Sequence, residues 1–403
     1  MKNLTKKQII TLSILGTLGL LFIVYVILSL TYKYPSETFI EPKALNPIIV
    51  SFGNIEIRWY AICVVGGASA LSVYGYKCFL KKTKMDADTC LTGVTFGLIS
   101  GILGARIYYV IFNPPVDLWD NGILRGIIYA LNPSQGGLAI HGGIYAAILF
   151  VFIYAKIKHV KFLELIEIVL PVFMLAQVVG RWGNFFNQEA YGPSVLGLTG
   201  NLTSEQLIAQ HEYLRHLLVP NFIVKNMYFT DFNYDSAFFG TTAYFHPTFF
   251  YEGVANLIGA VTFIELRKRV KKLYIGDAIC FYLAWYGFVR FFIELLRQDP
   301  LRFSFKVFGV YPRVAVVTSV LFVIVGVTLF ILRRVFKYHL VSSKEFLYEG
   351  GSLWQDGYTA PGKLVEVENL EEESQIENVT DSDESLSQEV SSEEKEENNP
   401  DEE

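Results

Sequence analysis

The chain has 403 residues, of which 52% are hydrophobic and 18% are charged. Soluble domains are about one quarter charged, so this composition excludes an ordinary soluble protein and favours an integral membrane protein. The net charge of −5 hides a segregation, because residues 371–403 hold fifteen acidic residues and one lysine while the rest of the chain is basic. A basic, apolar body suits contact with anionic membrane lipids, and we expect membrane lipids rather than nucleic acid as partners.

Apolar runs long enough to cross a bilayer core of about 30 Å recur along the chain. They predict an all-α integral membrane protein with about eight transmembrane helices. The predicted spans are Ile9–Leu30, Trp59–Tyr76, Thr92–Phe112, Gly136–Ala155, Phe162–Arg181, Pro247–Glu265, Ile275–Leu295 and Arg313–Leu332. Basic residues gather before the first span and after the second, fourth, sixth and eighth. Because these loops alternate, the positive-inside rule places them and both termini in the cytoplasm.

Three regions follow from this pattern. Residues 1–50 form an N-terminal membrane anchor and linker; a cleaved signal peptide is the alternative, but the apolar run exceeds twenty residues and no A-x-A site follows it. Residues 51–340 form the polytopic body, with an aromatic-rich extracytoplasmic insertion at about 187–245 that is either functional or a small domain of its own. Residues 341–403 form an acidic cytoplasmic tail that we predict to be mostly disordered.

Ionisable residues interrupt the predicted spans, where a charged side chain is costly and normally faces a cavity or a partner. One series shares a single helix face, at spacings of i, i+4, i+8 and i+11: Tyr286, Arg290, Glu294 and Arg297. Others lie within or beside further spans: Tyr60, Arg106, His141, Arg181, Asn184 and His246. Glycines flank His141 and Arg181, which permits close approach of a neighbouring helix or a ligand.

These polar residues allow two interpretations. An intramembrane Arg–Glu pair can be purely structural, and a lone histidine can be a satisfied core residue. Glycine-bracketed polar motifs on three spans instead indicate a wet cavity on the outer side. We expect two or three arginines there without matching carboxylates, which suits an anionic ligand because the guanidinium fork matches phosphate oxygens. In a bilayer the abundant phosphate belongs to lipid headgroups, so the pattern predicts an enzyme or carrier for a phospholipid or lipid phosphate.

The segment Gly180–Gly192, which reads GRWGNFFNQEAYG, is similar to the signature G-R-x-G-N-F-x-N-x-E-x-x-G of the bacterial prolipoprotein diacylglyceryl transferases. Weaker matches follow in the family's order: Trp59-Tyr60, Gly104-Ala105-Arg106 with Tyr109, His141-Gly142-Gly143, His246-Pro247 with Tyr251-Glu252, and Tyr286 to Pro300. Together they cover about residues 52–330. The resemblance implies a seven-helix core, to which Ile9–Leu30 adds an anchor. The insertion before His246 looks longer than usual, and the last span reads Tyr311-Pro312-Arg313-Val314-Ala315 where the family has a Gln-x-x-Ser-like stretch.

The resemblance implies an enzyme of the bacterial cytoplasmic membrane, with an outward-facing active site and with neither cofactor nor metal. Its substrates would be phosphatidylglycerol and the signal peptide of a prolipoprotein with a lipobox cysteine. The diacylglyceryl group would move onto the cysteine thiol, forming a thioether and releasing glycerol phosphate, as the first step of lipoprotein maturation. Such a thiol needs a nearby base, and the departing phosphate needs fixed cations.

The resemblance also implies roles for the polar residues. Arg181 and Arg290 would clamp the phosphate, and Glu294 would orient Arg290 through the i,i+4 spacing. Asn184 and Glu189 would position headgroup hydroxyls or the arginines. The remaining candidates for phosphate or substrate binding are Tyr60, Arg106, Gly192, His246, Tyr286 and Arg297. His141 is the first candidate for the base; hydrogen bonding to the headgroup and helix packing are its alternative roles.

Two other functions fit part of the sequence. A carrier or flippase for an anionic lipid would also use a basic cavity, but carriers usually show two similar halves and we find no internal repeat. A scaffold that recruits partners through the acidic tail leaves the glycine-bracketed motifs unexplained. The four cysteines lie in or beside apolar runs without CxxC spacing, so we expect neither a disulfide framework nor a metal site.

Overall fold

The structure is a computed structural model, in which most of the body of the chain is described. The described residues are 23–31, 33, 42, 44–52, 55–112, 114, 122–131, 139–233, 236–298, 302–303, 306, 310–338, 340–359 and 363–364, apart from the side chains at positions 140 and 141. The predicted anchor is described only at residues 23–30, which are helical. The acidic residues 371–403 lie outside the described set.

Six helical segments of the described chain are long and apolar enough to cross a membrane. They are Trp59–Cys78, which comprises α2 (Trp59–Ala61), the π-helical turn η1 (Ile62–Gly66) and α3 (Gly67–Cys78), then α4 (Ala87–Phe112), α7 (Phe162–Asn187), α10 (Thr248–Arg269), α11 (Asp277–Leu296) and α12 (Val314–Val335). A shorter apolar helix, α6 (Ile140–Ile157), corresponds to the predicted span 136–155. The mostly helical membrane architecture that the sequence predicts is therefore confirmed for six spans.

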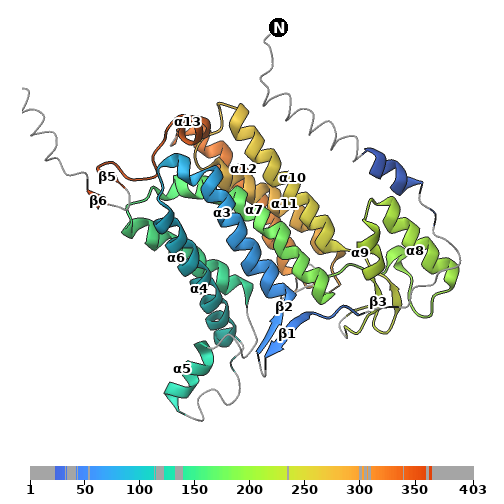
Figure 1. The fold of residues 1–403 in the computed structure, drawn as a ribbon. Coiled ribbons are helices and arrows are strands. Elements are labelled where there is room, and N and C mark those ends of the chain that lie inside the picture. The colour runs from blue at the N-terminus through green and yellow to red at the C-terminus, as the bar shows by residue number, and fades with distance from the viewer. Residues whose placement is uncertain are drawn as a thin grey trace, which may run out of the picture.

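The helices form two groups (Figure 1). One group contains α7, α10, α11 and α12, with α3 packed against α7. The other is the pair α4 and α6, which pack mainly against each other, followed by the short helix α5 (Ile123–Leu131). The backbones of α4 and α6 approach closely at their glycines, since a Cβ on Gly104 would lie 2.7 Å from the carbonyl oxygen of Gly142. A two-stranded antiparallel sheet, β1 (Ile48–Phe52) and β2 (Ile55–Arg58), leads into α2.

Helix α7 extends six residues beyond the predicted end at Arg181. Its polar last turns remain helical because side chains of the same segment pair there, and Gln188 then leaves the helix with a φ of +47°. The amide of Glu189 donates to the carbonyl oxygen of Asn184 across this turn. The signature segment is therefore one continuous helix followed by a tight reversal, which brings Glu189 back toward Asn184.

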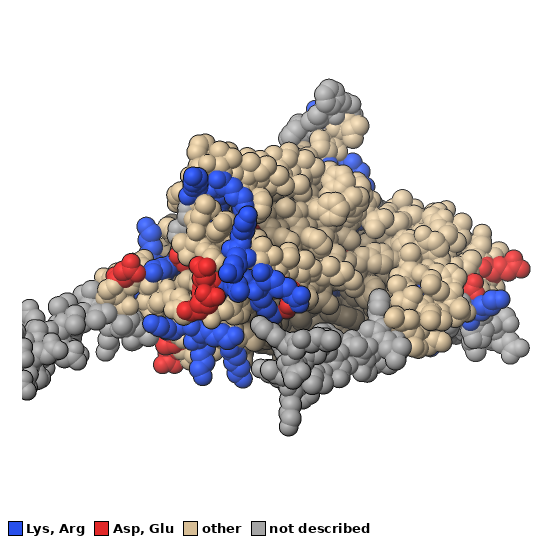
Figure 2. Space-filling view, turned by 90° about the horizontal axis from the view of Figure 1, so that it is seen from above, with Lys and Arg blue, Asp and Glu red and all other residues tan. Residues whose placement is uncertain are grey.

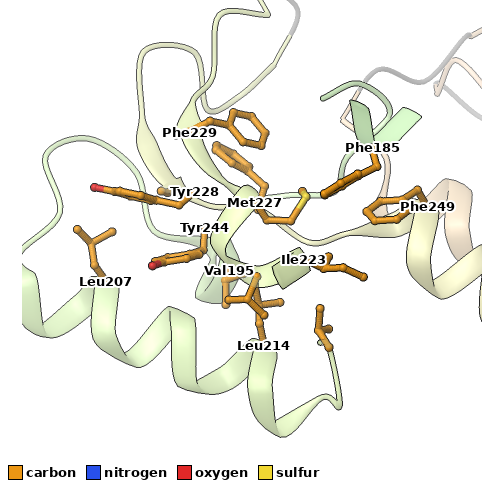
Figure 3. Close-up of a cluster of buried hydrophobic side chains, with 14 of the residues drawn as sticks. Phe185, Val195, Leu207, Leu214, Ile223, Met227, Tyr228, Phe229, Tyr244 and Phe249 are labelled. Atoms are coloured by element: carbon orange, nitrogen blue, oxygen red, sulfur yellow. The ribbon is translucent and has the colours of Figure 1, made fainter. Parts of the chain in front are cut away.

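The insertion after α7 folds around an apolar core of its own (Figure 3). Its elements are η4 (Val195–Gly197), α8 (Ser204–His216), α9 (Asn221–Asn226), β3 (Tyr228–Thr230) and β4 (Thr242–Tyr244), with β3 and β4 antiparallel. Thr203 and Gln206 form a capping box that starts α8. The core packs on Phe185 of α7 and Phe249 of α10, so it fixes the insertion to the ends of the two helices.

The opposite end of the molecule, which we call the α13 end, is closed by residues 340–359. This segment includes α13 (Ser343–Tyr348), and the strand pair β5 (Tyr358–Thr359) and β6 (Lys363–Leu364) follows it. Leu353 and Trp354 are buried, and Leu353 exchanges backbone hydrogen bonds with Thr83 and Lys161. Residues 341–359 of the predicted tail are therefore folded against the body.

A buried carboxylate anchors this closure. Glu167 of α7 accepts hydrogen bonds from the amides of Gly276 and Ala278, at 2.8 and 3.0 Å, and from the hydroxyl of Ser343 at 2.9 Å. All the loops that the sequence marks as basic between spans meet this end, where lysine and arginine side chains gather (Figure 2). Their common position agrees with the alternation on which the predicted topology depends.

Candidate active site

A cluster of two arginines and two glutamates joins α7, α10 and α11 at the end of the body that lies opposite α13, which we call the site end. The guanidinium of Arg181 donates to Glu252 at 2.6 Å. The guanidinium of Arg290 lies 3.5 Å from the other oxygen of Glu252 and donates to Glu294 at 2.7 Å. Glu252 therefore bridges the two arginines, and each of the three helices contributes at least one charge.

The burial of these side chains is asymmetric. The carboxylates of Glu252 and Glu294 are 2% and 3% exposed, whereas the arginine side chains of Arg181 and Arg290 are 24% and 14% exposed. The carboxylates thus support the guanidinium groups from behind and leave part of each guanidinium open to a ligand. Because a buried charge that loses its partner is strongly destabilising, removing either kind of group should disturb the whole cluster.

This arrangement corrects the expectation that the arginines lack matching carboxylates. Glu252 approaches them from α10, and no spacing along α7 or α11 reveals a contact between separate helices. The crevice above the cluster nevertheless keeps an excess of positive charge, because three arginines and one glutamate line it. Its lining residues are Arg181, Asn184, Ala190, Thr248, Phe249, Glu252, Arg290, Ile293 and Arg297.

The end of α7 adds a second layer of polar groups to the crevice. Arg181 donates to the side-chain oxygen of Asn184 at 3.3 Å, and the amide group of Asn184 donates to Glu189 at 3.0 Å. Asn187 also donates to Glu189, at 3.3 Å. Glu189 is exposed, so this carboxylate is held at the rim by two amide groups and stays accessible. Arg181 and Asn184 lie three residues apart on α7 and so share a helix face, which allows their hydrogen bond.

Two tyrosines flank the cluster. Tyr60 begins the span 59–78 and packs directly on Gly183, where an added Cβ would lie 2.6 Å from the tyrosine ring. Its hydroxyl group is within electrostatic range of Arg181 and Glu189. Tyr286 of α11 lies within the field of both arginines and both glutamates of the cluster. Both candidates are therefore brought to the site. Tyr60 comes from α2, and Tyr286 comes from α11, the helix that carries Arg290.

Arg313 holds the end of α11, although the sequence suggested no role for it. Its guanidinium donates to the backbone carbonyl oxygens of Glu294 and Arg297. A cation at this position stabilises the negative end of the α11 dipole. It also adds a second donor to the carbonyl oxygen of Glu294, which already accepts from the amide of Arg297. Arg313 directly precedes α12, so it ties the start of that helix to the turn that carries Glu294 and Arg297.

Gly192 and His246 pair through their backbones beside the crevice. The amide of Gly192 donates to the carbonyl oxygen of His246 at 2.9 Å, and a Cβ on Gly192 would lie 2.8 Å from the Cβ of His246. Glycine is therefore needed at position 192 for this close approach. The ring of His246 lies 3.1 Å from the hydroxyl of Tyr251, and burial lowers the pKa of His246, which favours the neutral ring.

Arg106 and His141 belong to the α4–α6 pair. Arg106 is almost fully buried, reaches the carbonyl oxygen of Tyr129 at 3.4 Å and lies over the rings of Tyr109 and Tyr129. These contacts join α4 to α5, and none of them joins Arg106 to Arg181. His141 lies in the first turn of α6, and its side chain is outside the described residues.

The sequence assigned no role to two residues that build the site, Glu252 and Arg313, although both lie in segments compared with the family. A Tyr-Glu pair four residues into an apolar span was a signal for Glu252, because an intramembrane carboxylate needs a cationic partner. Arg313 had a weaker signal, since arginine at the start of a span resembles an interfacial residue. Among the described residues, no three His, Cys, Asp or Glu side chains lie close enough together to hold a metal ion.

Comparison with known proteins gives one consistent result. Residues 47–332 match the family model described as prolipoprotein diacylglyceryl transferase. A phosphatidylglycerol–prolipoprotein diacylglyceryl transferase of Streptococcus mutans serotype c is 38% identical over 296 residues, which cover 72% of this chain and 96% of the relative. A protein with the same description from Staphylococcus aureus strain Newman is 33% identical over 297 residues, which cover 72% of this chain and 90% of the relative.

Proposed function

This chain belongs to the prolipoprotein diacylglyceryl transferase family of membrane enzymes, and we propose that it transfers diacylglyceryl from phosphatidylglycerol to the lipobox cysteine of a prolipoprotein. The cysteine sulfur attacks the glyceryl carbon that carries the phosphate ester. A carbon–sulfur bond forms as the carbon–oxygen bond breaks, and glycerol phosphate leaves with the bonding electrons. The thiol proton passes to a base, so atoms and charges balance without a cofactor.

The partly exposed guanidinium groups of Arg181 and Arg290 support this proposal most strongly. The substrate phosphodiester carries one negative charge, and the leaving group gains a second as the bond breaks. Cations already fixed in position stabilise that developing charge more than they stabilise the substrate, which lowers the barrier. Glu252 and Glu294 hold the two guanidinium groups in position, because both carboxylates are buried behind the arginines and form ion pairs with them.

The remaining candidates surround this phosphate position. Asn184 and Glu189 are hydrogen-bonded to each other at the rim, where they would meet the glycerol hydroxyls of the headgroup. Tyr60 and Tyr286 would donate hydrogen bonds to phosphate oxygens from two sides. Arg297 lines the same crevice and would extend its positive charge toward the departing glycerol phosphate.

His141 remains our candidate for the base that accepts the thiol proton. It begins α6, whose glycines bring that helix against α4 near Gly104. In this arrangement the α4–α6 pair supplies the base and the larger helix group supplies the phosphate clamp. Arg106, on α4, would support the pair through α5, while Gly192 and His246 would shape the wall of the crevice on the insertion side.

The proposed orientation places the α13 end in the cytoplasm and the site end at the outer side of the bacterial cytoplasmic membrane. Lysines and arginines gather at the α13 end, which favours the cytoplasmic side under the positive-inside rule. Eight spans complete this topology when Ile9–Leu30 crosses the membrane as an added anchor. The insertion around α8 and α9 then lies outside, where it would border the path of an incoming prolipoprotein.

The test uses purified protein in vesicles that contain phosphatidylglycerol, with a lipobox peptide as acceptor. Glycerol phosphate and a diacylglyceryl-modified peptide should appear in equal amounts. A peptide with serine in place of the lipobox cysteine provides the control, because it lacks the thiol and should give neither product. If phosphatidylglycerol moves between leaflets without either product, the protein is a lipid carrier and the proposed reaction is wrong.

A further inference from the structure

Three polar residues lie toward the α13 end from the arginine–glutamate cluster, each one helical turn from a cluster residue or from the adjacent Tyr286. Gln177 precedes Arg181 by four residues on α7, Asn256 follows Glu252 by four residues on α10, and Tyr282 precedes Tyr286 by four residues on α11. The spacing i,i+4 keeps each residue on the face of its cluster neighbour. We call these three residues, Gln177, Asn256 and Tyr282, the second level; each comes from one of the helices that build the cluster.

The directions of the helices place these residues at a common depth. Helices α7 and α11 run from the α13 end to the site end, whereas α10 runs the opposite way. Arg181 and Glu252 meet at 2.6 Å, so four residues backward on α7 and four residues forward on α10 descend equally, by about 6 Å. Gln177 and Tyr282 meet directly, with the amide nitrogen of Gln177 donating to the tyrosine hydroxyl at 3.0 Å.

Hydrogen bonds among the described residues leave several polar side-chain atoms of this level without a partner. Asn256 is 0% exposed, and neither its side-chain oxygen nor its side-chain nitrogen has a hydrogen-bond partner among the residues that the structure describes. The side-chain oxygen of Gln177 is also buried and has no hydrogen-bond partner among the described residues. The Tyr282 hydroxyl accepts from Gln177, which leaves its own proton to donate. The level therefore offers donors on Asn256 and Tyr282 and acceptors on Gln177 and Asn256.

Water is the ligand that fits this set. A buried water normally makes about three hydrogen bonds, both donated and accepted, and it occupies polar sites that would otherwise be costly. A buried divalent metal ion would be costly without an anionic ligand to compensate its charge, and these three side chains are neutral. A lipid phosphate would be expected at the arginines above, where the charge lies. The mixed donors and acceptors match a small neutral molecule that can rotate.

We propose that Gln177, Asn256 and Tyr282 form a hydrated polar layer whose ordered water holds the Arg181–Glu252–Arg290 cluster in position from below. The layer reaches the cluster through Tyr282, whose ring stacks on Tyr286 with a centroid separation of 5.5 Å. Tyr282 also lies within electrostatic range of Glu252 and Arg181. The three side chains are positioning residues, because they act through the cluster and do not touch the substrate.

The layer affects the rate more than substrate binding. Without the layer both arginines keep their charge but are held less firmly, so the monoanionic phosphodiester still binds. The developing second charge on the leaving phosphate needs guanidinium groups held in one geometry, which the layer provides. This inference rests on the proposed transferase reaction for its kinetic test, whereas its water can be observed independently of any activity.

The direct test is a structure of the full chain in lipid nanodiscs at a resolution that shows water. Water density within hydrogen-bonding distance of Asn256 and Gln177 is expected. A dry level, with the two amide groups facing only apolar atoms, would overturn the proposal whether or not the enzyme is active. An inactive wild-type protein that contains this water would instead count against the proposed reaction alone.

The kinetic test uses Asn256→Leu, which keeps the number of side-chain heavy atoms and the branch at Cγ but removes the hydrogen-bonding groups. We expect kcat for glycerol phosphate release to fall about tenfold while KM for phosphatidylglycerol stays within threefold. Asn256→Ser leaves room for a further water and should keep at least half of the wild-type kcat. A more heat-stable Asn256→Leu protein with unchanged kcat would show that the layer is dry and has no positioning role.

Two further variants provide a control and an alternative for this test. Ser319→Ala is the matched control, since Ser319 is also a buried hydroxyl in a span and has no partner among the described residues. It lies on α12, which contributes no residue to the layer, so its kcat should not change. Tyr282→Phe removes one hydroxyl and tests the layer if Asn256→Leu does not fold. We expect a severalfold lower kcat for Tyr282→Phe, and a wild-type kcat with that variant would contradict the proposal.

Discussion

The substitution Glu252→Gln isolates the charge that joins the two arginines, because glutamine keeps the shape of glutamate. At 2.6 and 3.5 Å, the gross attraction of the carboxylate is about 6 kcal/mol to Arg181 and about 5 kcal/mol to Arg290 in an effective dielectric constant of about 20. Desolvation of the buried charges cancels much of this attraction. Removing one partner of a buried ion pair typically costs about 3–5 kcal/mol.

The glutamine oxygen can still accept a hydrogen bond from Arg181, so the lower end of that range applies. We expect the free energy of unfolding to fall by about 3 kcal/mol. An equal loss of transition-state stabilisation would lower turnover about 100-fold, since about 1.4 kcal/mol corresponds to a factor of ten. Both follow from one cause, which is that Arg181 and Arg290 repel each other and no longer hold one geometry.

The assay combines glycerol phosphate release in phosphatidylglycerol vesicles with thermal unfolding in detergent. Glu265→Gln, on the same helix, is the matched control. Glu265 pairs with Lys268 at 2.5 Å, but its side chain is 44% exposed, and such a surface pair contributes about 1 kcal/mol or less. Wild-type turnover and stability in Glu252→Gln would refute the inference that this carboxylate organises the site.

Three further predictions follow from the site and the insertion. Arg181→Lys keeps the charge but loses the planar guanidinium, so turnover should fall at least about 100-fold while the protein stays membrane-inserted in a fractionation assay; near-normal activity would contradict the phosphate clamp. Arg313→Ala should lower the free energy of unfolding by about 1–3 kcal/mol, because two carbonyl oxygens at the end of α11 lose the guanidinium as a donor, and Arg313→Gln should recover part of that loss in thermal unfolding. Burial lowers the pKa of His211 to about 4, so its neutral form stabilises the fold above pH 6.5, and this contribution is lost between about pH 6.5 and pH 4 at up to about 1.4 kcal/mol per pH unit. His211→Gln should flatten that part of the pH–stability curve, and an unchanged curve would show that another group titrates.

The sequence predicted the membrane helices well because the bilayer restricts them so strongly. A span must be apolar over a defined length, and basic loops alternate from side to side, so composition alone identifies both features. The i,i+4 pairing of Arg290 with Glu294 was predictable for a similar reason, since it lies within one helix. The extension of α7 to Asn187 was not, because polar residues normally end a predicted span.

The contacts that complete the site could not be predicted from one sequence. The bridge from Glu252 to both arginines depends on how α7, α10 and α11 pack, and helix packing is set by side chains on all three. The bond from Arg313 to the end of α11 depends in the same way on the position of α12. Arg106 shows the opposite case. The sequence marks it as a site candidate, but the structure shows it connecting α4 to α5 through the carbonyl oxygen of Tyr129.

The closure at Glu167 also fixes the order in which the chain can be completed during synthesis. The hydroxyl of Ser343 that bonds this carboxylate is 176 residues farther along the chain. At about 5–20 residues per second, the ribosome needs roughly 9–35 s to make that stretch. Helix α7 is therefore made while Glu167 still lacks the hydroxyl of Ser343 as a donor. The α13 end closes only after residues 340–359 have left the ribosome. A chain that ends just after α12 would contain all six spans that the structure describes but would leave this pocket open.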